Sequence, residues 1–372
     1  MPGKLIVRKQ TLLVVSLLLL IGIPLPPMAR AQSNTQSNIS NRNQQQDERL
    51  TELLKEGRKL VDAGNFSGAI AVYRQAAELD SQNAKIFSGI GYLQARQGNF
   101  QEAATYYQQA IALDPKNAEF HYALGYNLAN LGRNDEAIAA YQGATKLNPR
   151  HVNAFLGLGV VYSRMERYRE AATVYRQVTA IDARNAKAFE LLGAMLIQQD
   201  RPREAIEPLQ KAIQLSPRSG SAHVTLGAAW LSLGNLAEGL SAFNRAAQLE
   251  PRNGAIQLQI GKIWKAKGRT QDALKAFQRA AALQPSLTEA HLAQGDIYLE
   301  QKDYLGAIIS YRQYTTLQPQ DPDGHFKLGS ALKARDRKQE AIAAFEQAKR
   351  LYQEQGKSNR VRDVEKVIKE LK

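Results

Sequence analysis

One glycine recurs every 34 residues over most of this chain. It occurs nine times without an insertion or deletion, as Gly57, Gly91, Gly125, Gly159, Gly193, Gly227, Gly261, Gly295 and Gly329. Segments 98–115 (GNFQEAATYYQQAIALDP) and 132–149 (GRNDEAIAAYQGATKLNP) show the pattern directly, because glycine, alanine, tyrosine and proline stay in step. A fixed period of this length indicates that one structural unit is repeated along the chain.

Four further positions keep the same period. A small residue stands twelve residues after each glycine: Ala69, Ala103, Ala137, Ala171, Ala205, Gly239, Ala273, Ala307 and Ala341. A large side chain follows four residues later: Tyr73, Tyr107, Tyr141, Tyr175, Leu209, Phe243, Phe277, Tyr311 and Phe345. A second alanine stands three residues beyond it in seven of the nine repeats, and prolines 115, 149, 217, 251, 285 and 319 close most of them.

These positions predict a helix, a tight turn and a second helix in every repeat. The turn often contains glycine beside a polar residue, as in Gly98-Asn99 and Gly132-Arg133. Small residues let the two helices cross closely, and we expect the aromatic side chain to fill the space toward the next repeat. Proline ends the second helix because it has no amide hydrogen. A lone helix pair cannot bury its apolar face, whereas a stack of pairs can.

This pattern resembles the tetratricopeptide repeat (TPR) family. The resemblance covers residues 50–355 and implies an all-α fold, a right-handed superhelical α-solenoid of helical hairpins whose concave groove binds peptides or partner helices. The sequence departs from the pattern locally. Tyr314 stands where a small residue is expected, so repeats eight and nine could be splayed, and Pro208 should bend the second helix of repeat five.

The repeats divide most of the chain into equal units. Their predicted bounds are 50–83, 84–117, 118–151, 152–185, 186–219, 220–253, 254–287, 288–321 and 322–355. Residues 356–372 follow as an expected capping helix, with an apolar stripe at Val361, Val364, Ile368 and Leu371 that could cover the end of the stack. The basic side chains of this segment could instead touch an anionic partner.

The N-terminus has the layout of a secretory signal peptide. A short cationic start precedes the uncharged apolar segment 11–23, and Ala29-Arg30-Ala31 predicts cleavage before Gln32, so that residues 1–31 are removed. The alternative is an uncleaved anchor, but 13 apolar residues rise only about 20 Å as a helix. Residues 32–49 are expected to be a disordered Gln/Asn/Ser-rich spacer. We therefore expect export, to a periplasm, the exterior or a thylakoid-like lumen, with no transmembrane span in the mature chain.

No residue pattern indicates an enzyme. The chain has no cysteine, which excludes disulfides, thiolate metal sites and thiol nucleophiles. Phosphate-binding loops, dinucleotide fingerprints and nucleophile elbows do not occur, and nothing outside the repeats could hold a catalytic domain. Four histidines share one repeat position: His121, His223, His291 and His325. Because phenylalanine holds that position in other repeats, we interpret them as packing residues and expect neither metal nor cofactor.

The family pattern places its binding groove on the first helices. Carried onto this sequence, it predicts groove residues Tyr92, Arg96, Tyr122, Tyr126, Asn130, Arg164, Lys262 and Lys265. Tyrosine and arginine supply most energy per contact at interfaces, and arginine pairs with carboxylates through two bonds. The alternative is that the tyrosines only complete packing between repeats. The lysine–asparagine clamp of the chaperone-binding subclass is absent, since Leu54, Arg58, Gly89, Glu119 and Ala123 hold its positions.

These observations favour a non-catalytic scaffold that binds a protein or peptide partner in its groove. The alternative is an envelope component whose basic faces bind an anionic glycan or membrane surface. Without the four basic residues of the signal, the chain keeps 45 basic and 35 acidic side chains, a net charge of +10. The same positive charge could bind nucleic acid, but export places the chain in the wrong compartment, so we do not expect a nucleic-acid partner.

Overall fold

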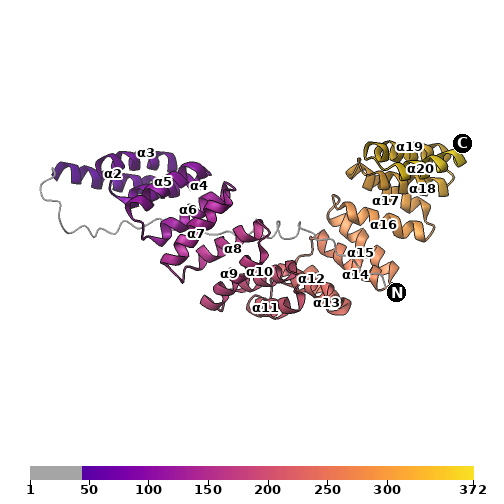
Figure 1. Cartoon of the computed structure of the whole chain (residues 1–372), viewed down its shortest axis with the longest axis horizontal. Coiled ribbons are helices and arrows are strands. Elements are labelled where there is room, and N and C mark those ends of the chain that lie inside the picture. Colours follow the sequence, from indigo (N-terminus) through magenta and orange to yellow (C-terminus); the bar gives the residue numbers. More distant parts are fainter. Residues whose placement is uncertain (1–43) are drawn as a thin grey trace. The chain divides into compact units, whose positions relative to one another are not determined.

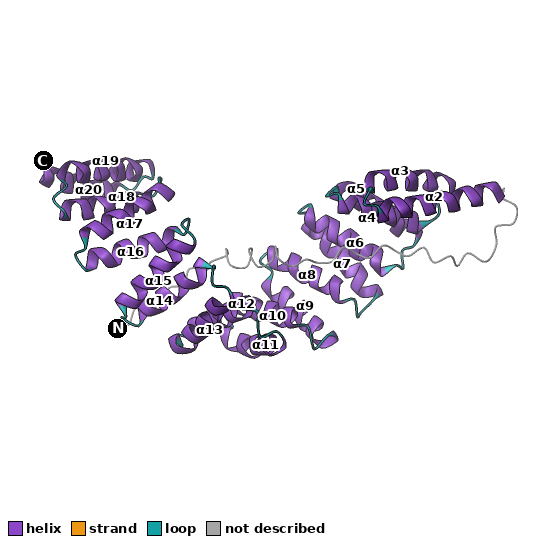
Figure 2. Ribbon diagram, turned by 180° about the vertical axis from the view of Figure 1, so that it is seen from behind, coloured by secondary structure: helices purple, strands orange, loops and turns teal. Residues whose placement is uncertain are grey.

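The computed structural model describes residues 44–372, and these residues form helices joined by short turns (Figures 1 and 2). The first helices of the nine repeats are α2 (Gln44–Asp62), α4 (Ala84–Arg96), α6 (Ala118–Asn130), α8 (Val152–Arg164), α10 (Ala186–Gln198), α12 (Gly220–Ser232), α14 (Gly254–Ala266), α16 (Thr288–Glu300) and α18 (Pro322–Ala334). The second helices are α3 (Phe66–Leu79), α5 (Phe100–Leu113), α7 (Asn134–Leu147), α9 (Tyr168–Ile181), α11 (Pro202–Leu215), α13 (Leu236–Leu249), α15 (Thr270–Leu283), α17 (Tyr304–Leu317) and α19 (Lys338–Glu354). Helix α20 (Ser358–Leu371) follows.

The chain divides into two compact bodies, which we describe separately. The N-terminal body ends at Ser216 and its described part contains repeats one to five. The C-terminal body runs from Pro217 to Lys372 and contains repeats six to nine and α20. Within each body every first helix packs against its own second helix, and each one after the body's first repeat also packs against the second helix of the repeat before it. No helix of the part described, residues 44–372, is both long and apolar enough to cross a membrane.

A left-handed backbone residue turns the chain between the two helices of every repeat. Five repeats use glycine with φ between 71° and 83°: Gly64, Gly98, Gly132, Gly234 and Gly268. Four others place a side chain in the same conformation, with φ between 57° and 60°: Glu166, Asp200, Lys302 and Asp336. Because a Cβ is disfavoured there, these four turns are strained relative to the glycine turns.

Four of the turns between repeats are held by an acidic residue and an asparagine three residues later. Asn83 donates from Nδ2 to Asp80 Oδ2 at 3.0 Å, while its own Oδ1 accepts from the backbone N–H of Lys85 and caps α4. Asn185 and Asp182 form the same contact at 3.3 Å, and Asn253 with Glu250 at 2.8 Å. An asparagine at this position satisfies backbone donors that the helix start leaves open.

The recurrent glycine makes room for the large side chain of its own repeat. A Cβ on Gly295 would lie 2.4 Å from the Tyr311 ring, and a Cβ on Gly125 would lie 2.8 Å from the Tyr141 ring. Tyr141 also reaches the next repeat, where a Cβ on Gly157 would lie 2.5 Å from it. The ring therefore fills space on both sides, toward its own first helix as well as toward the next repeat.

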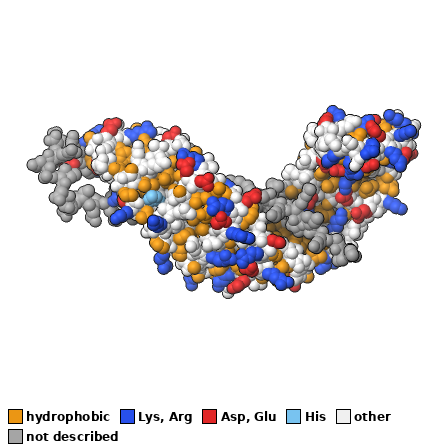
Figure 3. Space-filling model, viewed as in Figure 1, with side chains coloured by type: hydrophobic (Ala, Val, Ile, Leu, Met, Phe, Trp, Pro, Cys, Tyr) orange, Lys and Arg blue, Asp and Glu red, His pale blue; other side chains and the backbone are white. Residues whose placement is uncertain are grey.

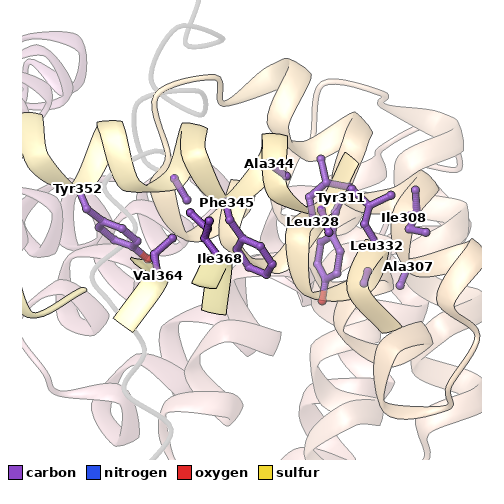
Figure 4. Packing of buried hydrophobic residues seen from close by; sticks show 13 residues of the cluster. Ala307, Ile308, Tyr311, Leu328, Leu332, Ala344, Phe345, Tyr352, Val364 and Ile368 are labelled. Atoms are coloured by element: carbon purple, nitrogen blue, oxygen red, sulfur yellow. The ribbon is translucent and has the colours of Figure 1, made fainter. Parts of the chain in front are cut away.

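The end of the C-terminal body is covered by α20. Val364 and Ile368 are buried in one cluster with Phe345 and Tyr352 of α19 (Figure 4). Arg360 of α20 donates to Asp323 of α18 at 2.9 Å, which ties the two helices together at their polar edge. The apolar side chains of α20 thus cover the end of the stack, and its charged side chains face outward.

Tyr314, which stands in place of a small residue, is accommodated without a gap. A Cβ on Gly324 of the next repeat would lie 2.5 Å from its ring, so this glycine provides the space the ring needs. Its hydroxyl donates to Asp321 Oδ2 at 2.6 Å. Two departures from the repeat pattern therefore compensate each other, and the size of Tyr314 does not require the repeats to splay.

Candidate partner-binding surface

Successive first helices of the N-terminal body carry a row of aromatic and polar side chains. Helices α4, α6 and α8 contact one another in that order. Their outward side chains include Tyr92, Arg96, Tyr126, Asn130 and Arg164, which we call the aromatic–arginine strip. Both tyrosines are half-buried, whereas the two arginines and the asparagine are exposed. These side chains combine flat apolar area with open hydrogen-bond donors.

The strip is ordered by contacts among its own neighbours. Arg96 Nη1 donates to the Tyr92 hydroxyl at 3.3 Å, and its guanidinium lies 5.4 Å from the ring centroid of Phe66. The Tyr126 ring meets Phe100 edge to face at 6.4 Å. Stacking of this kind fixes side chains before a partner arrives and reduces the entropy lost on binding.

The polar members of the strip are anchored to backbone carbonyls. Arg164 Nη1 donates to the carbonyl of Ala129 at 2.6 Å, and Asn130 Nδ2 donates to the carbonyl of Tyr126 at 2.8 Å. Within residues 44–372, neither Arg96 nor Arg164 has a carboxylate partner. Both guanidinium groups therefore keep donors and full charge for a ligand.

Tyr122 does not belong to this surface, which corrects the sequence prediction. Its side chain is 1% exposed, and its ring lies 6.1 Å from that of Tyr141 and 4.9 Å from that of His151. Burial raises the pKa of its hydroxyl. The equivalent position holds Leu156 and Leu258 in other repeats, and this pattern could have indicated a core residue.

His151 is a structural residue that the sequence reading missed. Its Nδ1 accepts from the backbone N–H of Ala154 at 3.3 Å and so caps α8. The proton must then sit on Nε2, which faces Glu119 Oε1 of α6 at 3.3 Å. The contact with His151 lowers the pKa of Glu119. This contact joins α6 to the start of α8 beside the strip, while the Glu119 side chain stays half-exposed.

The predicted lysines of the C-terminal body lie in a different electrostatic setting. Lys262 pairs with Glu289 of the following first helix at 2.5 Å, and Lys265 is exposed. Further ion pairs join successive first helices and α20: Lys327–Asp296 at 2.5 Å and Lys333–Glu370 at 3.3 Å. Much of the positive charge here is already compensated, so this face offers less to an acidic ligand than the strip does.

The four periodic histidines hold the turn before their helix. Nε2 of His121, His291 and His325 donates to the carbonyl of Pro115, Pro285 and Pro319, at 3.0, 2.9 and 3.0 Å. His223 bonds to Pro217 in the same way, and burial lowers its pKa. Residues 44–372 contain no group of three side chains that could hold a metal ion. Each histidine therefore has a local structural role.

One hollow of the N-terminal body is lined by residues of α7, α8 and α9. It has a volume of about 520 Å³, with Phe155, Leu158 and Tyr162 of α8 as its floor. Gln142 of its wall already donates to the Tyr162 hydroxyl at 3.1 Å. Its lining also includes Glu170, whose carboxylate pairs with the nearby Arg167.

Comparison with known protein families is in line with this architecture. Tetratricopeptide repeat profiles match residues 258–322 and 322–355, and the profile of the cilia and flagella-associated protein 70 C-terminal domain matches residues 28–259. The chain belongs to the TPR family. Among curated proteins, none matches this TPR chain.

Several solved TPR structures are similar to parts of this chain. YrrB, described as a TPR protein with an unusual peptide-binding site, is 25% identical, covers 50% of this chain and 96% of its own, and has a TM-score of 0.44. MamA from Desulfovibrio magneticus is 28% identical over 45% of this chain and 95% of its own, with a TM-score of 0.43. PilF of Pseudomonas aeruginosa is 22% identical over 54% and 92%, with a TM-score of 0.48.

Proposed function

We propose that this TPR protein is a non-catalytic scaffold that binds a segment of a partner protein along the aromatic–arginine strip. The observation that carries the proposal is the pairing of half-buried tyrosines with guanidinium groups that lack carboxylates within residues 44–372. Stacked repeats present extended surfaces for such segments. Tyrosine and arginine are also the residue types most often found at the energetic centre of interfaces.

The chemistry of the strip favours a partner segment that carries both a flat apolar side chain and a carboxylate. Tyr92 and Tyr126 offer ring faces one repeat apart, and Arg96 and Arg164 offer donors on either side of Tyr126 along the helix order. A charge-assisted hydrogen bond to an arginine contributes about 1.5–3 kcal/mol. Loss of one such contact should therefore weaken binding by roughly tenfold or more.

We also propose that the protein acts outside the cytoplasm. The predicted signal peptide, residues 1–31, lies outside the described residues, so this part of the proposal rests on its sequence alone. N-terminal sequencing of the protein from the exported fraction tests it, with Gln32 as the expected first residue. Recovery of the intact N-terminus in the cytoplasm would contradict export.

An anionic envelope surface remains the alternative partner, but no structural feature favours it. On the face shown in Figure 3, Lys and Arg are interspersed with Asp, Glu and hydrophobic side chains and do not form one basic field. Ion pairs also compensate lysines of the C-terminal body. Binding to anionic polymer or vesicles that weakens steeply with salt would support this alternative.

The experiment that tests the proposal compares partner capture by matched variants of the full mature chain. In one variant Tyr92, Arg96 and Tyr126 are changed to alanine. In the control, Arg176 and Gln177, which are exposed on the second helix α9, are changed to alanine. We expect the first variant to lose a protein that both the wild type and the control capture. Equal capture by all three would refute a role for the strip.

A further inference from the structure

Helix α17 exposes two large aliphatic side chains that its fold does not require. Leu305 is 49% exposed and Ile309 is 56% exposed, and they stand four residues apart, on one helix face. The buried face of α17 consists instead of Ala307, Ile308 and Tyr311. Neither Leu305 nor Ile309 belongs to the adjoining core cluster.

The other repeats provide an internal comparison for these two positions. The position of Leu305 is otherwise held by Ser67, Gln101, Asp135, Arg169, Arg203, Ala237, Gln271 and Gln339. The position of Ile309 is otherwise held by Ala71, Thr105, Ala139, Thr173, Glu207, Ser241, Lys275 and Ala343. The repeat therefore accepts polar or small residues at both positions, and only repeat eight uses large aliphatic ones.

Other exposed leucines have an explanation within the repeat. Leu79, Leu147 and Leu317 share the last position of a second helix, which is leucine or isoleucine in repeats one to eight. Leu131 is the C-cap of α6. Leu305 and Ile309 remain as an apolar pair that neither the core nor the repeat pattern explains.

Cationic side chains border this pair. In two other repeats, the position of Leu305 lies within hydrogen-bond reach of the following turn, as in Gln97–Ser67 at 2.9 Å and Arg133–Gln101 at 3.4 Å. Arg335 and Arg337 hold the repeat positions of Gln97 and Arg133, so we infer that they lie near Leu305.

One turn beyond Ile309, Arg312 pairs with Glu340 at 2.6 Å, and Arg337 pairs with the same carboxylate at 2.5 Å. The rim made of Arg312, Arg335, Asp336, Arg337 and Glu340 thus carries one net positive charge.

We propose that Leu305 and Ile309 form a second docking site, which binds an amphipathic helix of another protein with acidic residues beside its apolar face. Two aliphatic side chains at helical spacing suit the ridges of a packed helix. The guanidinium groups select carboxylates at its edge. A second copy of this chain would bring like charges together across the contact, so it fits the rim less well.

Binding of two defined peptides to the full mature chain tests this site. Both peptides are helical and share a leucine face, but one carries glutamates along its edge and the other carries lysines. We expect fluorescence anisotropy to show saturable binding of the glutamate peptide, weakened by salt, and none of the lysine peptide. Equal binding of both peptides, or of neither, would overturn the proposal.

A variant that restores the ordinary repeat residues locates the site. Leu305→Gln together with Ile309→Ala copies Gln339 and Ala343 of repeat nine, and should weaken the glutamate peptide by roughly ten- to a hundredfold. Leu317→Ala, which changes another exposed leucine, serves as the control and should leave binding intact. Unchanged binding in the double variant would overturn the assignment.

Charge reversal and the strip variant complete the test. Arg335→Glu should weaken the glutamate peptide and allow the lysine peptide to bind. The variant in which Tyr92, Arg96 and Tyr126 are alanine should bind the glutamate peptide like the wild type, so failure of this site and failure of the proposed function are distinguishable. Two other outcomes would make the proposal wrong, if neither peptide bound. Loss of a dimer in the double variant would identify the occupant as a second copy of this chain, and loss of co-sedimentation with phosphatidylglycerol vesicles would identify it as a membrane.

Discussion

Replacing one recurrent glycine by alanine should destabilise the C-terminal body. A Cβ on Gly295 would lie 2.4 Å from Tyr311, so the ring must move by about 1 Å to reach ordinary contact. The ring is not free to move, because it is buried and its hydroxyl donates to Asp296 at 2.8 Å. Overpacking of this kind costs about 3 kcal/mol at its upper range, while alanine favours the helix by about 1 kcal/mol. We expect a net loss of about 2 kcal/mol.

Gly91→Ala is the matched control for this substitution. Its Cβ would lie 3.1 Å from Tyr107, so the neighbouring ring needs to move by only about 0.3 Å. The gain in helix propensity should offset this small strain, and the net change should be close to zero. The pair therefore separates crowding from a general intolerance of alanine at this position.

Hydrogen exchange is the suitable assay, because stability in a stacked array is distributed over local units. Gly295→Ala should raise amide exchange in α16 and α17 by roughly thirtyfold, and Gly91→Ala should leave exchange in α4 and α5 almost unchanged. Equal protection in the two variants, or higher protection in Gly295→Ala, would refute the reasoning.

Three further changes test other parts of the structure. Lys302→Gly should stabilise the protein by about 1 kcal/mol, because glycine adopts the left-handed backbone conformation of this turn without strain, and Gly98→Lys should destabilise it by a similar amount. A thermal unfolding scan that shows no change in either variant would contradict this. Burial lowers the pKa of His223, so its contribution to stability is present above its ordinary pKa of 6.5 and is lost as the pH falls below that value. His223→Phe should therefore reduce the dependence of the unfolding free energy on pH between about pH 7.5 and 5.5. An unaltered pH dependence would count against this role of His223. Ile368→Ala should cost about 2–4 kcal/mol and raise exchange in α20, whereas the exposed Lys369→Ala should not.

The fold could be predicted from the sequence because each structural requirement recurs nine times. The spacing of Gly125, Ala137 and Tyr141 predicts a pair of helices that cross closely, and in the structure the Tyr141 ring packs directly against Gly125. Left-handed residues such as Glu166 and Lys302 were harder to predict, since only their place in the repeat, and not their residue type, marks the turn.

The details of the candidate surface depend on contacts between repeats, which one repeat does not encode. Tyr122 and Tyr126 are both tyrosines of one first helix, yet Tyr122 is buried under His151, the N-cap of α8 at the junction with the next repeat, and Tyr126 is half-exposed. The pairing of Lys262 with Glu289 also crosses from one repeat to the next.

One such contact did leave a signal in the sequence. All four periodic histidines stand six residues after a proline whose carbonyl they bind, as His121 does after Pro115. Phe87 and Phe189 hold the position of these histidines in two other repeats, and neither has a proline six residues before it. Phe155 and Gln257 also stand six residues after a proline, Pro149 and Pro251, so this pair of positions signals the hydrogen bond only where the second residue is histidine.

The most direct test of the proposed scaffold is photo-crosslinking to its native partner. A photoreactive phenylalanine analogue in place of Tyr126 reports contacts at the aromatic–arginine strip. The same analogue in place of Gln108, which is exposed on the second helix α5, reports contacts elsewhere on the same body. We predict a discrete protein adduct from position 126 and none from position 108. An adduct from position 108 alone, or none from position 126, would contradict binding along the first helices.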